Sequence, residues 1–167
     1  MEAQKFLSGN DGRKAESEFR SWLDRNSFPW IFLDQEPGNG YSNYLRMDGV
    51  GRPDYIVIVP FVGSIAVDVK ERSFLRPYNF YISQAELNKL CGFSSLSRMS
   101  IWVVFYASGD YAHFYIANLE RVRSMGLKRY AMRDGNVCFD IPVSWCERIS
   151  SSESRGFSII LNGINNI

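Results

Sequence analysis

Several features that mark common protein classes are missing from this sequence of 167 residues. No apolar run approaches the roughly 20 residues that a helix needs to cross a bilayer. The opening residues, MEAQK, lack the apolar core of a secretory signal peptide. These absences predict a cytoplasmic protein with no membrane partner.

Cysteine and histidine are scarce as well. The three cysteines, Cys91, Cys138 and Cys146, have no metal-ligand spacing, and their odd number argues against a disulfide framework. We interpret them as reduced thiols. His113 is the only histidine, which disfavours a histidine-based zinc site, and a serine–histidine–aspartate triad would require His113 itself as the base.

The charges nearly cancel, with 19 Lys and Arg against 18 Asp and Glu. A net charge of +1 is low for a nucleic-acid-binding protein, so attraction to phosphates would have to come from local patches. The hydrophobic fraction of 46% and aromatic fraction of 15% predict a packed core. The length predicts one domain over 1–167, with a core at about 11–118 and a C-terminal extension at about 119–167.

The most informative segment is a pair of strands over 52–59 and 64–70, joined by a short turn. Side chains alternate along a strand, so Asp68 and Lys70 project from the same face. In a hairpin of this length Asp54 can lie beside them. Two carboxylates and one ammonium at the end of an apolar sheet suit a divalent metal and a phosphate. The alternative is an acid near a turn with a solvated Asp/Lys pair on a half-buried strand.

An amphipathic helix is predicted upstream, over residues 11–23. Glu16 and Glu18 flank its apolar stripe on opposite sides, so the periodicity leaves open which of them reaches a site. The stripe has the spacing of a core-facing helix. It consists of Ala15, Phe19, Trp22 and Leu23.

A second helix is predicted directly after the strand pair. Ser83 and Glu86 form a capping box at its start, and Gly92 is predicted to end it in a left-handed conformation. Gln84 then lies in its first turn. There it is either a good helix former at an exposed position or a polar group near the site.

The other apolar segments complete an α/β plan. Strands are predicted over 29–34, 101–106, 111–117 and 137–141. The order of the core is therefore helix, three strands, helix, strand. No internal repeat and no second domain are predicted.

Residues 53–54 (Pro-Asp) and 68–70 (Asp-Val-Lys), with the helices on either side, resemble the signature of the PD-(D/E)xK nuclease superfamily. The resemblance covers roughly residues 12–107 in order of elements. It implies a restriction-endonuclease-like core, in which helices flank a central mixed β-sheet.

The nearest branch is that of the archaeal Holliday-junction resolvases. Their first helix carries a glycine, three residues and then the catalytic glutamate, and Gly12 and Glu16 have this spacing here. The resemblance therefore favours Glu16 over Glu18. Related nucleases often place a glutamine near the active site on the helix after the catalytic strand, which gives Gln84 a catalytic interpretation.

The resemblance implies a Mg²⁺ site, with Mn²⁺ able to substitute. Mg²⁺ prefers hard oxygen ligands and commonly takes one or two carboxylates. Asp54 and Asp68 are the expected ligands, joined by the carbonyl of Val69 and by Glu16. Lys70 is expected to remain protonated in so acidic a site and to stabilise negative charge on the phosphate.

The implied function is a metal-dependent endonuclease that hydrolyses DNA phosphodiester bonds, with branched DNA as the nearest substrate class. A restriction- or phage-type enzyme that cuts duplex DNA is the first alternative. A non-catalytic nucleic-acid-binding module of the same fold is the second, and RNA remains open as a substrate. Because resolvases act as dimers, a homodimer is the expected assembly.

Two groups of cations are candidates for DNA binding. Arg72 and Arg76 lie beside Lys70 in the sequence. The second group alternates with apolar residues further along the chain. It comprises Arg121, Arg123, Lys128 and Arg129.

Overall fold

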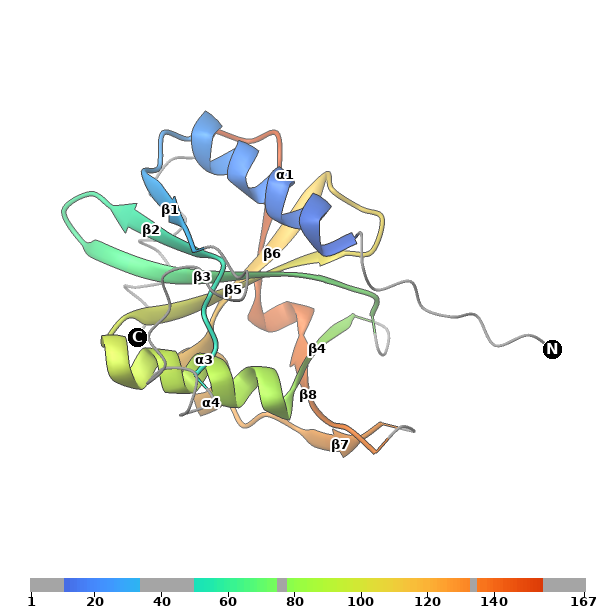
Figure 1. The fold of residues 1–167 in the computed structure, drawn as a ribbon. Coiled ribbons are helices and arrows are strands. Elements are labelled where there is room, and N and C mark those ends of the chain that lie inside the picture. Colours follow the sequence, from blue (N-terminus) through green and yellow to red (C-terminus); the bar gives the residue numbers. More distant parts are fainter. Residues whose placement is uncertain (1–10, 34–49, 75–77, 133–134, 155–167) are drawn as a thin grey trace.

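A six-stranded mixed sheet lies at the centre of the protein (Figure 1). The computed structural model describes residues 11–33, 50–74, 78–132 and 135–154. The spatial order of the strands is β1-β2-β3-β5-β6-β9, with β3 and β5 parallel and the other pairs antiparallel. Their bounds are β1 Trp30–Phe32, β2 Tyr55–Val59, β3 Gly63–Arg72, β5 Ser100–Ala107, β6 His113–Asn118 and β9 Glu147–Ser150.

A smaller antiparallel sheet has the order β4-β8-β7. Its strands are β4 (Asn79–Ser83), β8 (Val137–Pro142) and β7 (Arg129–Ala131), and a short 3₁₀ turn, η1 (Val143–Trp145), follows β8. Phe80 of β4 stacks on Phe105 of the central sheet with ring centroids 4.7 Å apart. This stacking joins the two sheets.

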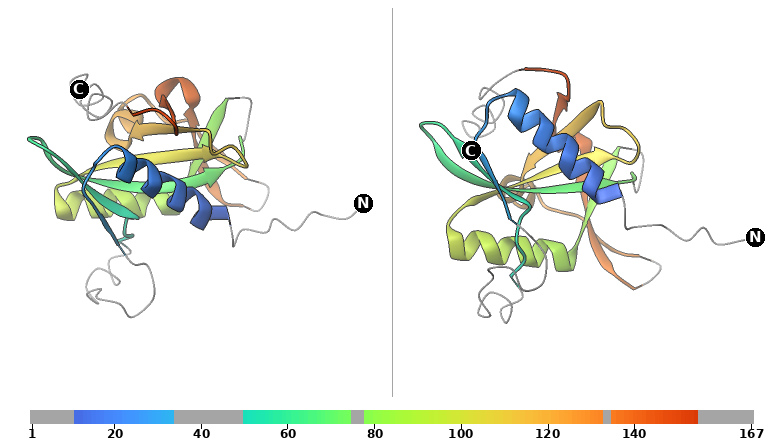
Figure 2. Two further views of the ribbon diagram at one scale, coloured as in Figure 1. Left: turned by 90° about the horizontal axis from the view of Figure 1, so that it is seen from above. Right: turned by 45° about the horizontal axis from the view of Figure 1, so that its top comes forward.

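Helix α1 (Asp11–Arg25) covers one face of the central sheet (Figure 2). The apolar stripe predicted from the sequence is buried there against β2, β3 and β5. Burying side chains of this size contributes about 1.5–3 kcal/mol each. The buried residues are Ala15, Phe19, Trp22 and Leu23.

Helices α3 (Gln84–Ser97) and α4 (Leu119–Ser124) cover the opposite face. Leu87 and Leu90 of α3 and Leu119 and Val122 of α4 belong to one buried cluster with the inward residues of β5. None of the helices in the described ranges is long and apolar enough to cross a membrane.

The alternation of side chains along β3 assigns each residue to one of these two faces. Val67 and Val69 pack into the cluster under α1, whereas Ala66 belongs to the cluster under α3. Every second residue after Ala66 projects from the same face as Ala66, namely Asp68, Lys70 and Arg72. These three side chains therefore lie on the α3 face of the sheet.

The segment that leads into β2 crosses α3 closely at Gly92. The prediction that α3 ends at this glycine is wrong. Gly92 does not end the helix, which continues to Ser97 and is capped by Arg98 in a left-handed conformation with φ 59°. A Cβ on Gly92 would lie 3.3 Å from Val50 Cγ2, and one on Gly51 would lie 2.7 Å from Lys89 Cβ. These glycines serve close packing of two segments.

The part of the chain after residue 118 supplies strands to both sheets. β9 adds to the edge of the central sheet beside β6, and β8 pairs with β4. The predicted strand over 137–141 is confirmed as β8. β4, β7, β9 and α4 were not predicted.

Candidate active site

Two buried aspartates face each other across β2 and β3. Asp54 directly precedes β2, whose first residue, Tyr55, pairs with Val67, the neighbour of Asp68 on β3. The Asp54 amide donates to the Val67 carbonyl at 3.0 Å, which ties Asp54 to β3 just outside the regular ladder. Asp54 is only 4% exposed and Asp68 only 3%.

Burial and proximity make both carboxylates unusually basic. Burial, followed by the charge of Asp68, raises the pKa of Asp54 to about 7. Burial also raises the pKa of Asp68, although the Lys70 ammonium acts in the opposite direction. A pair of like charges in such a place favours a bound cation or a proton.

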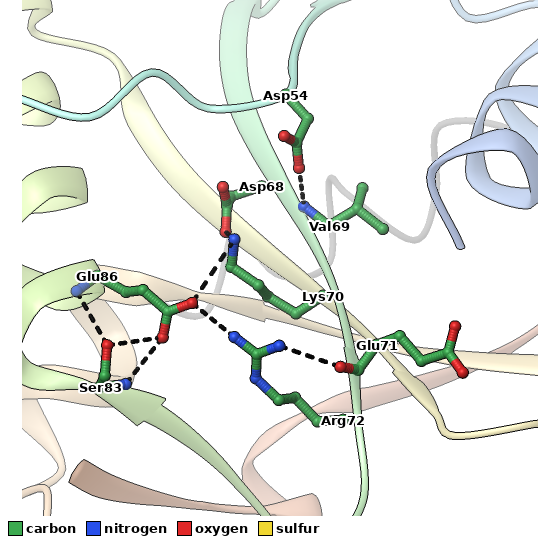
Figure 3. Close-up of polar contacts among 8 residues, drawn as sticks. All are labelled: Asp54, Asp68, Val69, Lys70, Glu71, Arg72, Ser83 and Glu86. Atoms are coloured by element: carbon green, nitrogen blue, oxygen red, sulfur yellow. Dashed lines mark hydrogen bonds and ion pairs between the residues drawn. The ribbon is translucent and has the colours of Figure 1, made fainter. Parts of the chain in front are cut away.

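The backbone of β3 orients one of these groups. The amide of Val69 donates to Asp54 Oδ2 at 2.6 Å (Figure 3). This hydrogen bond stabilises the ionised form of Asp54 and holds its side chain towards β3. The part of Val69 that contacts an acid is thus its N–H, whereas the sequence pointed to its carbonyl.

Lys70 lies against Asp68. Its Nζ is 2.8 Å from Asp68 Oδ2 and 3.9 Å from Glu86 Oε1. Burial favours the neutral amine, but the nearby carboxylates of Asp68 and Asp54 outweigh it and raise the pKa of Lys70. Lys70 is therefore an ammonium at neutral pH.

Glu86 of α3 is a member of this group that the sequence did not reveal. Its Oε2 accepts hydrogen bonds from Ser83 N at 3.0 Å and Ser83 Oγ at 2.8 Å, which completes the predicted capping box. Its Oε1 forms an ion pair with Arg72 Nη2 at 2.5 Å. The capping box was visible in the sequence, but the contacts with β3 depend on how α3 packs on the sheet.

Glu16 approaches from α1. Tyr55 Oη donates to the Glu16 carbonyl at 3.0 Å, which ties this turn of α1 to β2. Burial raises the pKa of Glu16, the Lys70 charge lowers it, and the Asp68 charge raises it. Glu16 is thus within electrostatic reach of the site, whereas Glu18 acts electrostatically on Tyr106.

Gln84 lies at the start of α3, as predicted. Its Nε2 donates to Asn88 Oδ1 at 2.8 Å, so the amide is engaged along its own helix. No contact with Asp54, Asp68 or Lys70 is found for Gln84 within the described ranges.

The cations predicted to bind DNA do not lie together in the structure. Arg72 belongs to the site through Glu86, and its guanidinium carbon lies 5.4 Å from the centre of the Tyr81 ring. Arg76 lies outside the described residues. The second group is exposed on α4 and at the start of β7. It comprises Arg121, Arg123, Lys128 and Arg129.

The oxygen donors of this site suit a hard divalent cation. Asp68 Oδ2 is fully buried and accepts no hydrogen bond of good geometry from the described residues, so its contact with Lys70 is one of charge. With Asp54 on the facing strand, the two carboxylates supply buried negative charge. Among the residues that the structure describes, however, no three acidic, histidine or cysteine side chains gather closely enough to hold a metal. Glu16 would have to approach further, or act through water.

Comparisons with known proteins give a structural match but no match by sequence. No protein-family model matches the chain, and no curated protein does. Among solved structures the chain is similar to Archaeoglobus fulgidus Hjc, a Holliday junction resolvase from an archaeal hyperthermophile. The TM-score is 0.51 at 19% sequence identity, over 80% of this chain and 89% of that chain.

This chain has the fold of Hjc. The predicted restriction-endonuclease-like architecture, with its mixed central sheet and flanking helices, is confirmed. The suspected resemblance to the PD-(D/E)xK nucleases is confirmed at the level of the fold. An identity of 19% carries no residue roles from Hjc to this chain.

Proposed function

We propose that this protein is a metal-dependent endonuclease that hydrolyses phosphodiester bonds in DNA, with branched DNA as its preferred substrate. One observation carries the proposal. In a chain with the fold of a Holliday junction resolvase, Asp54, Asp68 and Lys70 converge at one end of the β2–β3 pair.

The chemistry assigned to each residue follows from its surroundings. Asp54 and Asp68 would hold Mg²⁺ or Mn²⁺, with Glu16 as a further carboxylate from α1. Such an ion lowers the pKa of a bound water and neutralises charge on a phosphate. Lys70 remains protonated and stabilises the negative charge that develops on the scissile phosphate.

Cleavage of a labelled DNA panel tests this proposal. The panel contains single-stranded, duplex, flap and four-way-junction DNA, each with Mg²⁺, Mn²⁺ or EDTA. Wild type is compared with Asp68→Asn, Lys70→Ala and Glu71→Gln. Glu71 is the matched control, because it is a carboxylate on the same strand whose side chain bonds Tyr111 and the Gly109 amide, away from the site.

We expect metal-dependent cutting by wild type and Glu71→Gln, strongest on the junction. Asp68→Asn and Lys70→Ala should lose it by more than about 100-fold, because even residues that only support a metal's ligands cost 10–100-fold. Preferred cutting of plain duplex would favour a restriction- or phage-type enzyme. Robust cutting by Asp68→Asn would contradict the assignment of the site.

A second candidate is a DNA-binding module that does not cut. It is favoured by the direct contact between Lys70 and Asp68, and by the lack of a three-residue metal cluster in the described ranges. Such a module would bind the panel equally well in EDTA and in Mg²⁺. It would leave every substrate intact.

A further inference from the structure

Two carboxylates, from two different elements, form ion pairs with the ammonium of Lys70. Asp68, its neighbour on β3, is the nearer one, with Oδ2 at 2.8 Å. Glu86 on α3 is the second, with Oε1 at 3.9 Å (Figure 3). Asp54 also acts on the charge of Lys70. If a cation engages both aspartates, Glu86 is the carboxylate that remains at ion-pair distance from the ammonium.

Glu86 is held firmly enough to serve as an anchor. Three donors fix its two oxygens, namely Ser83 N, Ser83 Oγ and Arg72 Nη2. Arg72 is itself restrained, because its Nη1 donates to the Glu71 carbonyl at 3.1 Å and its guanidinium lies over Tyr81. The position of Glu86 therefore does not depend on Lys70.

The charge of Glu86 is also secure. Burial acts to raise its pKa, but the Arg72 guanidinium and the Ser83 amide outweigh burial and lower it. Lys70 and Arg72 are two residues apart on one face of β3, where their like charges repel. A carboxylate between them offsets that repulsion.

We propose that Glu86 is the positioning residue that keeps Lys70 in the active site when Asp68 is taken up by a metal ion. The inference rests on the proposed nuclease function, and it adds a residue that supports Lys70 from α3. Without Glu86, an ammonium displaced from Asp68 would be free to turn towards solvent. With Glu86 present, it stays where a scissile phosphate would meet it.

The contact can be tested without a metal, by removing the charge of Asp68. The mobility of the Lys70 ammonium is measured by ¹⁵N relaxation of the lysine side chains in Asp68→Asn, Glu86→Gln and the double variant. The exposed Lys128 serves as the internal reference for a free lysine. Glutamine keeps the capping box, since it is an accepted residue at that helix position.

We expect Lys70 to remain restrained in Asp68→Asn and to become as mobile as Lys128 in the double variant. If Lys70 is already free in Asp68→Asn, or is equally restrained in both, Glu86 does not position it. Circular dichroism of each variant shows whether it is folded. If the double variant is unstable, the kcat of Glu86→Gln decides the inference.

Cleavage kinetics give the second readout. Glu86→Gln should lower kcat about 10–100-fold with little change in KM, as found for groups that support a catalytic side chain. Glu71→Gln also removes one negative charge, from the residue next to Lys70 on β3, and should retain wild-type kcat. Equal kcat in the two variants would overturn the inference and leave the nuclease assignment intact. If wild type cuts nothing, the nuclease assignment fails, and the relaxation data alone decide whether Glu86 holds Lys70.

Discussion

The ammonium of Lys70 lies 2.8 Å from Asp68 Oδ2, at a carboxylate that a metal ion in this site would have to use. The same lysine is the expected electrostatic catalyst. In the proposed nuclease, Lys70 and the metal would therefore compete for one carboxylate, although turnover would need both. This competition can be measured directly.

Lys70→Met should bind Mn²⁺ more tightly than wild type and cut DNA much less. Removing one positive charge beside a divalent ion would favour the ion by more than about 1 kcal/mol even in a water-like dielectric, which corresponds to more than about 5-fold in affinity. Isothermal titration calorimetry with Mn²⁺ measures this. Weaker binding to the variant would mean that Lys70 does not face the metal.

The metal-free protein should become more stable as the pH falls from 8 to 5. The pKa of Asp54 is raised to about 7 in the folded state, against 3.8 as the ordinary value. The folded state thus binds this proton more tightly, so stability is lost as the pH rises through about 7. Over this window the gain is about 3 kcal/mol, or roughly 5–10 °C in Tm.

A variant of Asp54 measures how much of this pH effect comes from its carboxyl group. Asp54→Asn should reduce the dependence of Tm on pH in EDTA, because the amide does not titrate. The raised pKa values of Asp68 and Glu16 act in the same direction and remain in this variant. Glu86 has a lowered pKa, so its opposite contribution is lost only below about 4.5, outside the window. A wild-type Tm that falls between pH 8 and pH 5 would contradict a raised pKa for Asp54 in the folded state.

The part of the site that could be predicted is local. Asp54, Asp68 and Lys70 belong to one hairpin, where strand alternation and a short turn determine which side chains share a face. The sequence carries that information within about twenty residues. The predicted strand pair and both flanking helices are accordingly present.

The remainder depends on contacts between distant segments. Gly92 has the chemistry of a helix end, yet the helix continues through it to Ser97, and its missing side chain leaves room for Val50. Glu86 is recognisable as a cap, but its contact with Arg72 depends on the packing of α3 on β3. Neither relation has a sequence signal of its own.

The close crossing of the 50–54 segment over α3 predicts a cost for Gly51→Ala. The new Cβ would lie 2.7 Å from Lys89 Cβ, so one segment must shift. Overpacking of this kind costs about 2 kcal/mol, or roughly 4–8 °C in Tm. Because Asp54 follows three residues later, cleavage should fall as well.

Gly12→Ala is the matched control for this substitution. No atom lies within 4 Å of a Cβ at Gly12, in the first turn of α1. Alanine is favoured over glycine in a helix by about 0.5–1 kcal/mol, so the Tm should hold or rise. Thermal unfolding of the two variants distinguishes a steric clash at the crossing of residues 50–54 with α3 from a general effect of alanine on Tm. Equal Tm values would mean that the segment and α3 are further apart than the structure has them.

The exposed cations of α4 predict how binding to DNA responds to salt. Arg121 and Arg123 lie on the face of the sheet that carries Asp68, whereas Lys14 and Arg20 of α1 lie on the other. If the first pair contacts two phosphates, replacing both with alanine should reduce the slope of log K against log[salt] by about 2, since each contact contributes about 0.9. Binding should weaken by a similar factor on duplex and junction DNA, because phosphate contacts carry no sequence information.

Lys14→Ala/Arg20→Ala removes the same net charge and should leave the slope unchanged. Fluorescence anisotropy in EDTA at several salt concentrations measures both variants without cleavage. Equal slopes for the two would attribute the effect to net charge alone and remove the α4 cations from the DNA-binding surface.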